Sequence, residues 1–82
     1  LQYIRDGVYE AAVPLLQSVL DNSSGKDVAA NVLFWLGVSY EGLNDGRNAM
    51  LAFNQVVSVY PRHQLVPISL FRQATVLEKI QD

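Results

Sequence analysis

The stretch Phe34–Tyr40 reads FWLGVSY, and the glycine at its centre decides the fold. A glycine inside a helix costs about 1 kcal/mol relative to alanine, so a sequence that keeps one there uses the missing side chain. Small and apolar residues surround it at the i, i+3, i+4, i+7 spacing of one helix face: Leu33, Leu36, Gly37, Tyr40 and Leu43. This spacing predicts a helix over 29–43, in which Gly37 allows a second helix to approach closely.

A second helix follows after a turn. The residues Asn-Asp-Gly at 44–46 predict the turn, and an amphipathic stretch then runs from 47 to 60, where Pro61 ends it. Its inner face carries Ala49, Phe53, Val56 and Val57. Similar patterns predict single helices over 9–20, with Pro14 inside it, and over 69–80. The chain is thus expected to hold one complete helical hairpin with one further helix on each side.

A shift of about 37 residues superimposes the chain on itself. The superimposed pairs are Tyr3 and Tyr40, Ala12 and Ala49, Leu33 and Leu70, Phe34 and Phe71, Gly37 and Ala74, and Glu41 and Glu78. A helical repeat of this length is typical of an α-solenoid, in which each hairpin buries its apolar face against the next. We therefore expect an all-α solenoid: residues 1–27 end one repeat, 28–63 form a complete repeat, and 64–82 supply the first helix of the next.

These residues resemble the tetratricopeptide repeat (TPR). The residues that carry the resemblance, in the order and spacing of that family, are Leu33, Leu36, Gly37, Tyr40, Ala49, Phe53, Val56 and Pro61. The resemblance implies that Gly37 lies where the second helix of the hairpin crosses, and that Pro14, within AAVPLL, is tolerated inside its helix. The chain is also similar to a narrower group, the TPR proteins of the bacterial cell envelope, such as the Tol-Pal-associated cell-division coordinator. The features that carry this likeness are the period of about 37 residues and the stretches FWLG and LVPISLF. That likeness implies a periplasmic or outer-membrane-associated location, with the cytoplasm as the alternative.

Composition excludes several classes of function. The chain has 82 residues, half of them hydrophobic, and six basic against eight acidic residues give a net charge of −2. This balance offers no electrostatic footprint for nucleic acid. The sequence contains no cysteine, which excludes thiol catalysis and thiolate metal sites. No apolar run approaches the roughly 20 residues that a membrane-spanning helix needs, so we expect no direct membrane insertion.

Signals of catalysis or metal binding are weak. His63 is the single histidine, and no second histidine or carboxylate cluster stands near it at ligand spacing. We therefore expect it to be a solvated loop residue rather than a catalyst or a metal ligand. Glu41 and Glu78, one repeat apart, are expected to be solvated or to line a groove, because nothing nearby would separate their pKa values as an acid/base couple requires. The sequence predicts no enzyme, no cofactor and no metal.

A surface for binding proteins remains. In the first helix of the complete repeat and in its copy, eight residues lie off the buried stripe: Asn31, Phe34, Val38, Glu41, Ile68, Phe71, Thr75 and Glu78. TPR proteins bind peptides or helices on the concave face of their first helices, so the resemblance implies that these eight residues line such a groove. TPR domains that clamp the acidic C-terminus of chaperones use lysine, arginine and asparagine along their first helices, whereas this surface offers Phe34, Val38 and Glu41. The resemblance therefore implies an apolar helix or extended hydrophobic segment as the partner rather than an acidic tail.

Alternatives remain open for the aromatic residues and for the function. Phe34 and Phe71 either border the groove or pack between adjacent repeats. Trp35 points nearly opposite to Leu33, and we expect it to pack against the preceding hairpin rather than to form an exposed anchor. The alternative function is a structural spacer or a homo-oligomerisation module, in which the apolar terminal helices stack on neighbouring repeats or on another copy and leave no ligand groove. A second alternative is an enzyme whose active site lies elsewhere in a longer protein.

Overall fold

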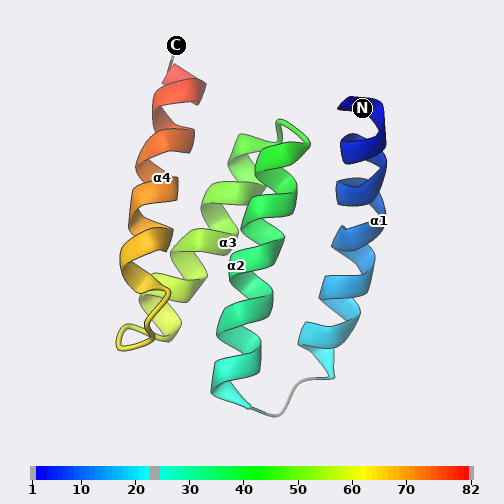
Figure 1. Ribbon diagram of the computed structural model, residues 1–82. Coiled ribbons are helices and arrows are strands. Elements are labelled where there is room, and N and C mark those ends of the chain that lie inside the picture. Colours follow the sequence, from blue (N-terminus) through cyan, green and yellow to red (C-terminus); the bar gives the residue numbers. More distant parts are fainter. Residues whose placement is uncertain (1, 23–24, 82) are drawn as a thin grey trace.

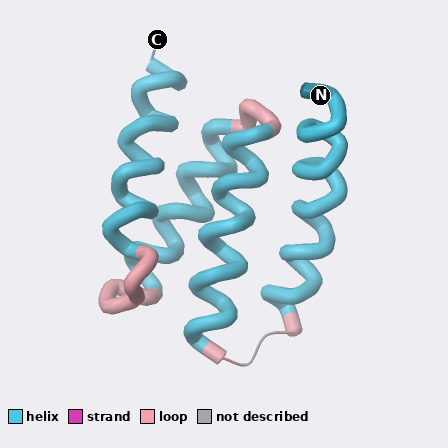
Figure 2. Tube along the Cα trace, viewed as in Figure 1, coloured by secondary structure: helices cyan, strands magenta, loops and turns pink. Residues whose placement is uncertain are grey.

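Four helices make up the described part of the chain. The computed structural model describes the backbone of residues 2–22 and 25–81, with side chains from residue 8 onward in these ranges. The elements are α1 (Gln2–Asp21), α2 (Lys26–Gly42), α3 (Gly46–Val59) and α4 (Val66–Gln81), and the described residues contain no strand (Figure 2). In Figure 1, α1 and α4 form the two flanks of the molecule, and α2 and α3 lie between them. The predicted all-α fold is confirmed.

The turn between α2 and α3 explains why a hairpin forms at this place. Asn44 adopts a left-handed conformation with φ 61°, which asparagine tolerates better than most residues. Asp45 then caps α3, because its Oδ1 accepts a hydrogen bond from the backbone N–H of Asn48 at 3.3 Å. The chain therefore reverses over three residues, and α3 begins one residue earlier than the sequence predicts.

Helix α1 is longer than expected. The sequence predicts a helix over 9–20, whereas α1 continues from Gln2 to Asp21 and includes Pro14. The repeat shift places Val8 where Asp45 caps α3. Because valine cannot accept a hydrogen bond from the backbone, nothing at this point starts a new helix, and the helix continues through it. The side chain of Tyr3, which the repeat shift pairs with Tyr40, lies outside the described residues.

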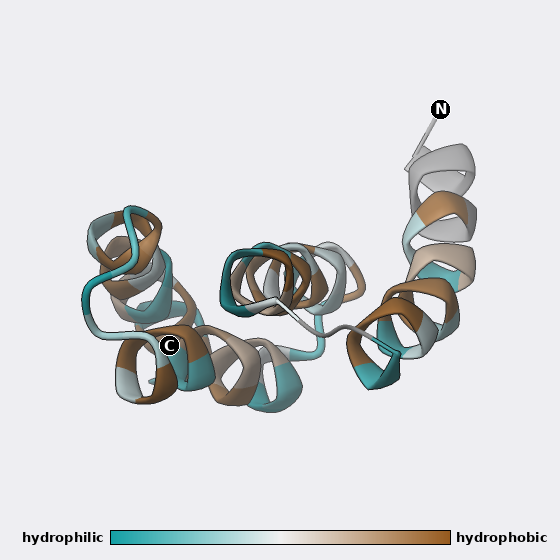
Figure 3. Ribbon diagram, turned by 90° about the horizontal axis from the view of Figure 1, so that it is seen from below, coloured by the Kyte–Doolittle hydropathy of each residue, from teal (hydrophilic) through white to brown (hydrophobic). Residues whose placement is uncertain are grey.

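The core is centred on the α2/α3 hairpin. A Cβ atom built on Gly37 would lie 2.5 Å from Cε1 of Phe53, whose side chain is wholly buried. This is the close approach that the sequence predicts for Gly37. The buried cluster also includes Val76 of α4, and hydrophobic residues of α1 pack against its other side. Figure 3 shows that hydrophobic residues occur along all four helices, not only in the central two.

Two glycines fix how the flanking helices pack, in opposite ways. Gly42, at the end of α2, lies directly under the ring of Tyr9 from α1, with no room for a Cβ atom. Gly46, at the start of α3, stands where Tyr9 stands one repeat earlier, and a Cβ atom there would lie 2.9 Å from Cδ1 of Ile80 in α4. The large side chain thus comes from the earlier helix at the first interface and from the later helix at the second.

Candidate functional site

On α2, the four predicted binding residues differ in their accessibility. Phe34 is only 5% exposed, with its ring centroid 5.4 Å from that of Trp35 and 5.7 Å from that of Phe53. It therefore packs in the core rather than bordering a groove, which is the second of the two alternatives given for it above. Asn31, Val38 and Glu41 are partly buried. The side chain of Asn31 donates to the backbone carbonyl oxygen of Asp27 at 2.8 Å, so it is held against its own helix.

On α4, the repeat equivalents are more accessible. Phe71 is 70% exposed, in contrast to Phe34 at the same repeat position, and Ile68 and Glu78 are exposed as well. Thr75 is partly buried, and its hydroxyl donates to the backbone carbonyl oxygen of Phe71 at 3.0 Å. The apolar part of this stripe therefore comes from α4, while α2 contributes mainly polar and half-buried groups.

An ion-pair cluster joins the two helices. Nη1 of Arg72 donates to Oε1 of Glu41 at 3.0 Å, and Nζ of Lys79 lies 3.9 Å from Oε2 of the same carboxylate. The guanidinium carbon of Arg72 also lies 5.8 Å from the ring centroid of Phe34, within the range of a cation–π contact. One arginine thus connects the aromatic and the acidic residue of α2 to α4, and Glu41 serves as an ion-pair acceptor.

Arg72 and Lys79 were not among the predicted site residues. Their spacing of seven residues puts both on the same side of a helix, which is the signal that could have pointed to them. This spacing indicates that both side chains lie on one side of α4. It does not indicate that Glu41 is their ion-pair partner, because Glu41 is 31 residues away from Arg72 in sequence. A contact between two separate helices leaves no local pattern in either of them.

Trp35 does not pack against a preceding hairpin. Its side chain is 53% exposed and touches the edge of the Phe34 ring in a T-shaped pair. The prediction of core packing is therefore wrong for the described residues. The reason is geometric, since Trp35 stands on the side of α2 where the first helix of an earlier repeat would lie, and none of the described residues occupies that place.

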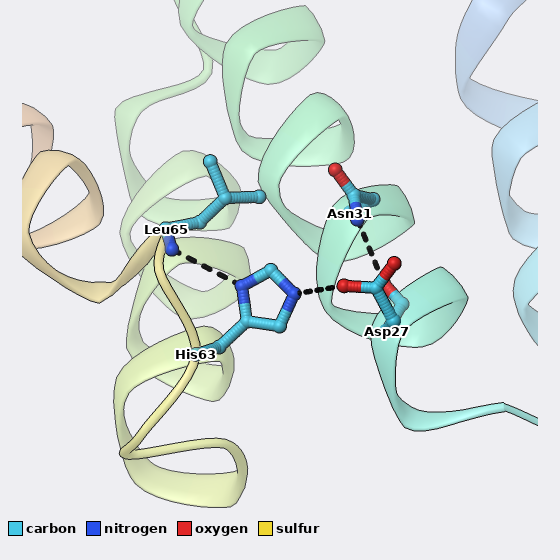
Figure 4. Close-up of polar contacts among 4 residues, drawn as sticks. All are labelled: Asp27, Asn31, His63 and Leu65. Atoms are coloured by element: carbon cyan, nitrogen blue, oxygen red, sulfur yellow. Dashed lines mark hydrogen bonds and ion pairs between the residues drawn. The ribbon is translucent and has the colours of Figure 1, made fainter.

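His63 is not a solvated loop residue. It lies in the loop between α3 and α4, but its side chain is only 10% exposed, and Nε2 lies 2.6 Å from Oδ1 of Asp27 in the first turn of α2 (Figure 4). The backbone N–H of Leu65 donates to Nδ1 at 3.1 Å, so in the neutral imidazole the proton sits on Nε2 and is donated to Asp27. The prediction of solvation is wrong because Asp27 comes from another helix, 36 residues earlier. The histidine ties the loop to α2.

Other kinds of site find little support in the described part of the chain. Within residues 2–22 and 25–81, no group of three or more acidic or histidine side chains is arranged to hold a metal ion. No helix described there is both long enough and apolar enough to cross a bilayer. A hollow of about 210 Å³ lies beside Glu41 and Lys79.

Comparison with known proteins identifies the central segment. Residues 31–63 match the family model of the tetratricopeptide repeat. No curated protein and no solved structure matches the chain. The family match supports a TPR domain, and with the four helices it gives an all-α, TPR-like helical repeat fold. TPR repeats in general mediate protein–protein interaction and are not catalytic, so protein binding is the kind of function that this match indicates.

Proposed function

We propose that this chain is a non-catalytic adaptor or scaffold that binds a partner peptide or helix along the first helices of its repeats, α2 and α4. The observation that carries the proposal is the exposure of Ile68 and Phe71 on α4, next to the ion-pair cluster that Glu41 forms with α4. Exposed aromatic side chains are the usual anchors of binding energy at protein interfaces. The proposed face consists of Asn31, Val38, Glu41, Ile68, Phe71, Thr75 and Glu78, whereas Phe34 is buried in the core and does not contribute to its surface.

The charges on this face favour an apolar partner. Arg72 and Lys79 both lie against the Glu41 carboxylate, so part of their positive charge is already compensated within the chain. An acidic peptide would have to compete with Glu41 for them. An amphipathic helix, or an extended segment with large apolar side chains, needs only the exposed surface of Ile68 and Phe71.

The experiment selects peptides from a random phage-displayed library against the immobilised chain and maps the best binder by amide chemical shifts. We expect apolar anchor residues in the selected peptides, with shifts concentrated at Asn31, Val38 and Thr75. Phe71→Ala should weaken binding about tenfold or more, since the exposed ring is the proposed anchor. The titration is run on dilute protein, so that contacts between copies do not contribute.

Val59→Ala is the matched control, because Val59 is an exposed apolar residue on α3, away from the proposed face. It should leave the affinity unchanged. Shifts confined to α1 and α3, or equal losses from Phe71→Ala and Val59→Ala, would reject the proposed face.

The proposal extends to the organisation and the setting of the protein. We propose repeat boundaries at 28–63, with 1–27 and 64–82 as partial repeats, which is supported by the internal shift of about 37 residues. We further propose a bacterial cell-envelope complex as the setting, supported by the likeness to envelope TPR proteins described above. Cell fractionation of the native protein tests the setting: recovery with periplasm or outer membrane is expected, and recovery with cytoplasm contradicts it.

A further inference from the structure

A groove between α1 and α3 lies apart from the proposed binding face. The two helices lie on either side of α2 (Figure 1), and the groove that they form with it, the α1/α3 groove, has a volume of about 410 Å³. None of the residues that line it belongs to the proposed face. Described residues of α1, α2 and α3 supply both walls and the floor, so the groove does not depend on any helix outside residues 2–22 and 25–81.

The floor of the α1/α3 groove is apolar. Leu33 and Leu36 of α2 and Ala52 of α3 line it with side chains that are at most 6% exposed. Leu20 of α1 and Leu51 of α3 also line it and are more accessible. A ligand in the groove therefore buries apolar surface against these residues.

The walls carry polar groups with unused hydrogen-bonding capacity. Nε2 of Gln17 donates to the hydroxyl of Tyr40 at 3.1 Å, and that hydroxyl donates to none of the described residues. Nδ2 of Asn48 donates to Oδ2 of Asp45 at 2.8 Å, and its Oδ1 accepts from none of them. The carboxamide of Gln55 makes no hydrogen bond within the described ranges. A ligand that displaces water from these groups has to replace the hydrogen bonds that the water makes.

An extended peptide meets this requirement better than a helix does. The main-chain N–H and C=O groups of an α-helix bond to each other, whereas those of an extended chain are open to side chains. A carboxamide can donate to the carbonyl oxygen of such a chain and accept from its N–H. Asn48 and Gln55 are seven residues apart, about 10 Å along α3, which matches about three residues of an extended chain.

Charge favours a basic residue in that peptide. Asp21 lines the groove at the end of α1 and forms no ion pair with the described residues. None of the described residues that line the groove is basic. The last turn of a helix is the negative end of its dipole, where a cation is favourable and a carboxylate is not. A lysine or arginine of the ligand would compensate both the carboxylate and the dipole.

We propose that the α1/α3 groove binds an extended segment of a partner protein that contains a lysine or an arginine. The main chain of the segment bonds to the carboxamides of Gln17, Asn48 and Gln55. Its basic side chain reaches Asp21. The inference does not rest on the proposed function, and because the two sites share no residue, the chain can hold a ligand in each.

Two peptide libraries give the test. Both consist of heptapeptides with blocked ends and random flanks, one with arginine fixed at the centre and one with glutamate. On the immobilised chain we expect at least fivefold more bound peptide from the arginine library. The best binder should shift the side-chain amide signals of Gln17, Asn48 and Gln55. Shifts at Val38 and Thr75 instead would place it on the proposed α2/α4 face and overturn the groove, not the proposed function.

Charge variants of α1 identify the position of the basic side chain. Asp21→Asn should weaken the best binder about fivefold, and Asp21→Lys should reverse the preference between the two libraries. Glu10→Gln is the matched control, because Glu10 is an exposed carboxylate of α1 outside the groove lining, and it should bind like the unaltered chain. Circular dichroism checks that each variant folds. Equal binding from the two libraries, or equal losses from Asp21→Asn and Glu10→Gln, overturns the proposal.

The conformation of the bound peptide is tested on its main chain. Methylation of a peptide nitrogen that contacts Asn48 or Gln55 should weaken binding about tenfold, because it removes the donor. A bound peptide that is helpless to this change, or that is helical by nuclear Overhauser effects, overturns the extended mode. The same side-chain amide signals should not move when the chain alone is concentrated. If they do, another copy fills the groove and the proposal fails.

Discussion

The central hairpin and the two flanking helices use the same repeat positions in opposite environments. Ala52 of α3 is buried, whereas Leu15, at the same position of α1, is mostly exposed. Phe34 of α2 lies in the core, whereas Phe71 of α4 lies in water. Residue type alone therefore does not determine burial here, because an apolar residue at a repeat position is buried only when a neighbouring helix covers it.

The largest difference is expected from truncating the core at equivalent positions. Phe53→Ala removes a wholly buried ring from α3 and should cost about 4 kcal/mol of unfolding free energy. Leu16→Ala, at the same position of α1, removes a half-buried side chain and should cost about 2 kcal/mol. Urea unfolding followed by circular dichroism measures both.

The unfolding free energy of a small domain is only about 5–15 kcal/mol in total, so a cost of this size can abolish cooperative unfolding of Phe53→Ala. That outcome would also agree with the expectation. Equal costs at the two positions would contradict the comparison, since they would mean that α1 is packed as firmly as α3.

Adding volume should separate the hairpin from the flank as well. Gly37→Leu would force a side chain into the ring of Phe53, and we expect a loss of about 3 kcal/mol. Ala74→Leu, the equivalent change on α4, places the larger side chain in solvent and should change the stability by about 0.5 kcal/mol or less in dilute solution. Thermal melts of both variants give the comparison. A stable Gly37→Leu variant would show that α2 and α3 do not meet at this glycine.

The sequence predicts the helices and the hairpin but not the contacts between helices. Spacing along one chain segment identifies the apolar face of α2 and the need for a small residue at Gly37, because both are local properties of a helix. The ion pair between Glu41 and Arg72, and the hydrogen bond between Asp27 and His63, join residues 31 and 36 positions apart. Neither leaves a periodic signal, so the sequence alone could not predict that Glu41 is paired or that His63 is largely buried.

A periodic sequence pattern also does not predict which of the candidate site residues are buried. Phe34 and Phe71 have the same side chain at the same repeat position, and only the arrangement of the neighbouring helices distinguishes them. The start of α1 is another feature that periodicity does not predict. The sequence indicates a helix that begins at residue 9, whereas α1 begins at Gln2. One residue, Val8 in place of Asp45, removes the helix cap, and a pattern of apolar positions does not record caps.

The two glycine contacts offer a smaller test of how the flanks pack. Gly42→Ala would press a methyl group against the rigid ring of Tyr9 and should cost about 1 kcal/mol or somewhat more. Gly46→Ala meets the exposed Ile80 side chain, which can rotate away, and Cγ1 of the buried Val76 at 3.2 Å, which has less room to move, so we expect a cost smaller than that at Gly42.

A double-mutant cycle sharpens this test. On a Tyr9→Leu background, Gly42→Ala should lose most of its cost, because the rigid ring is gone. Additive costs in the cycle would show that Gly42 and Tyr9 are not in contact, and the contrast between the two interfaces would then lose its basis.

A gain in stability, rather than a loss, is expected at a polar residue of the core. Ser69 of α4 is wholly buried, and among the described residues its hydroxyl oxygen has no hydrogen-bond partner. The equivalent position of α2 holds the buried Val32, so this position is apolar in the central hairpin. Ser69→Ala removes the unpaired hydroxyl and should raise the unfolding free energy by about 1 kcal/mol, and the melting temperature by roughly 4–8 °C.

The matched control is Ser58→Ala, because Ser58 is an exposed serine on α3 whose hydroxyl donates to the carbonyl oxygen of Asn54. It has the same gain in helix propensity but no buried hydroxyl to relieve, so any excess gain at Ser69 measures the cost of burial alone. If both variants change the melting temperature equally, the Ser69 hydroxyl is not a cost to the fold. The α4 flank would then tolerate a polar group where the central hairpin has only carbon, which would make its packing looser than the complete burial of Ser69 implies.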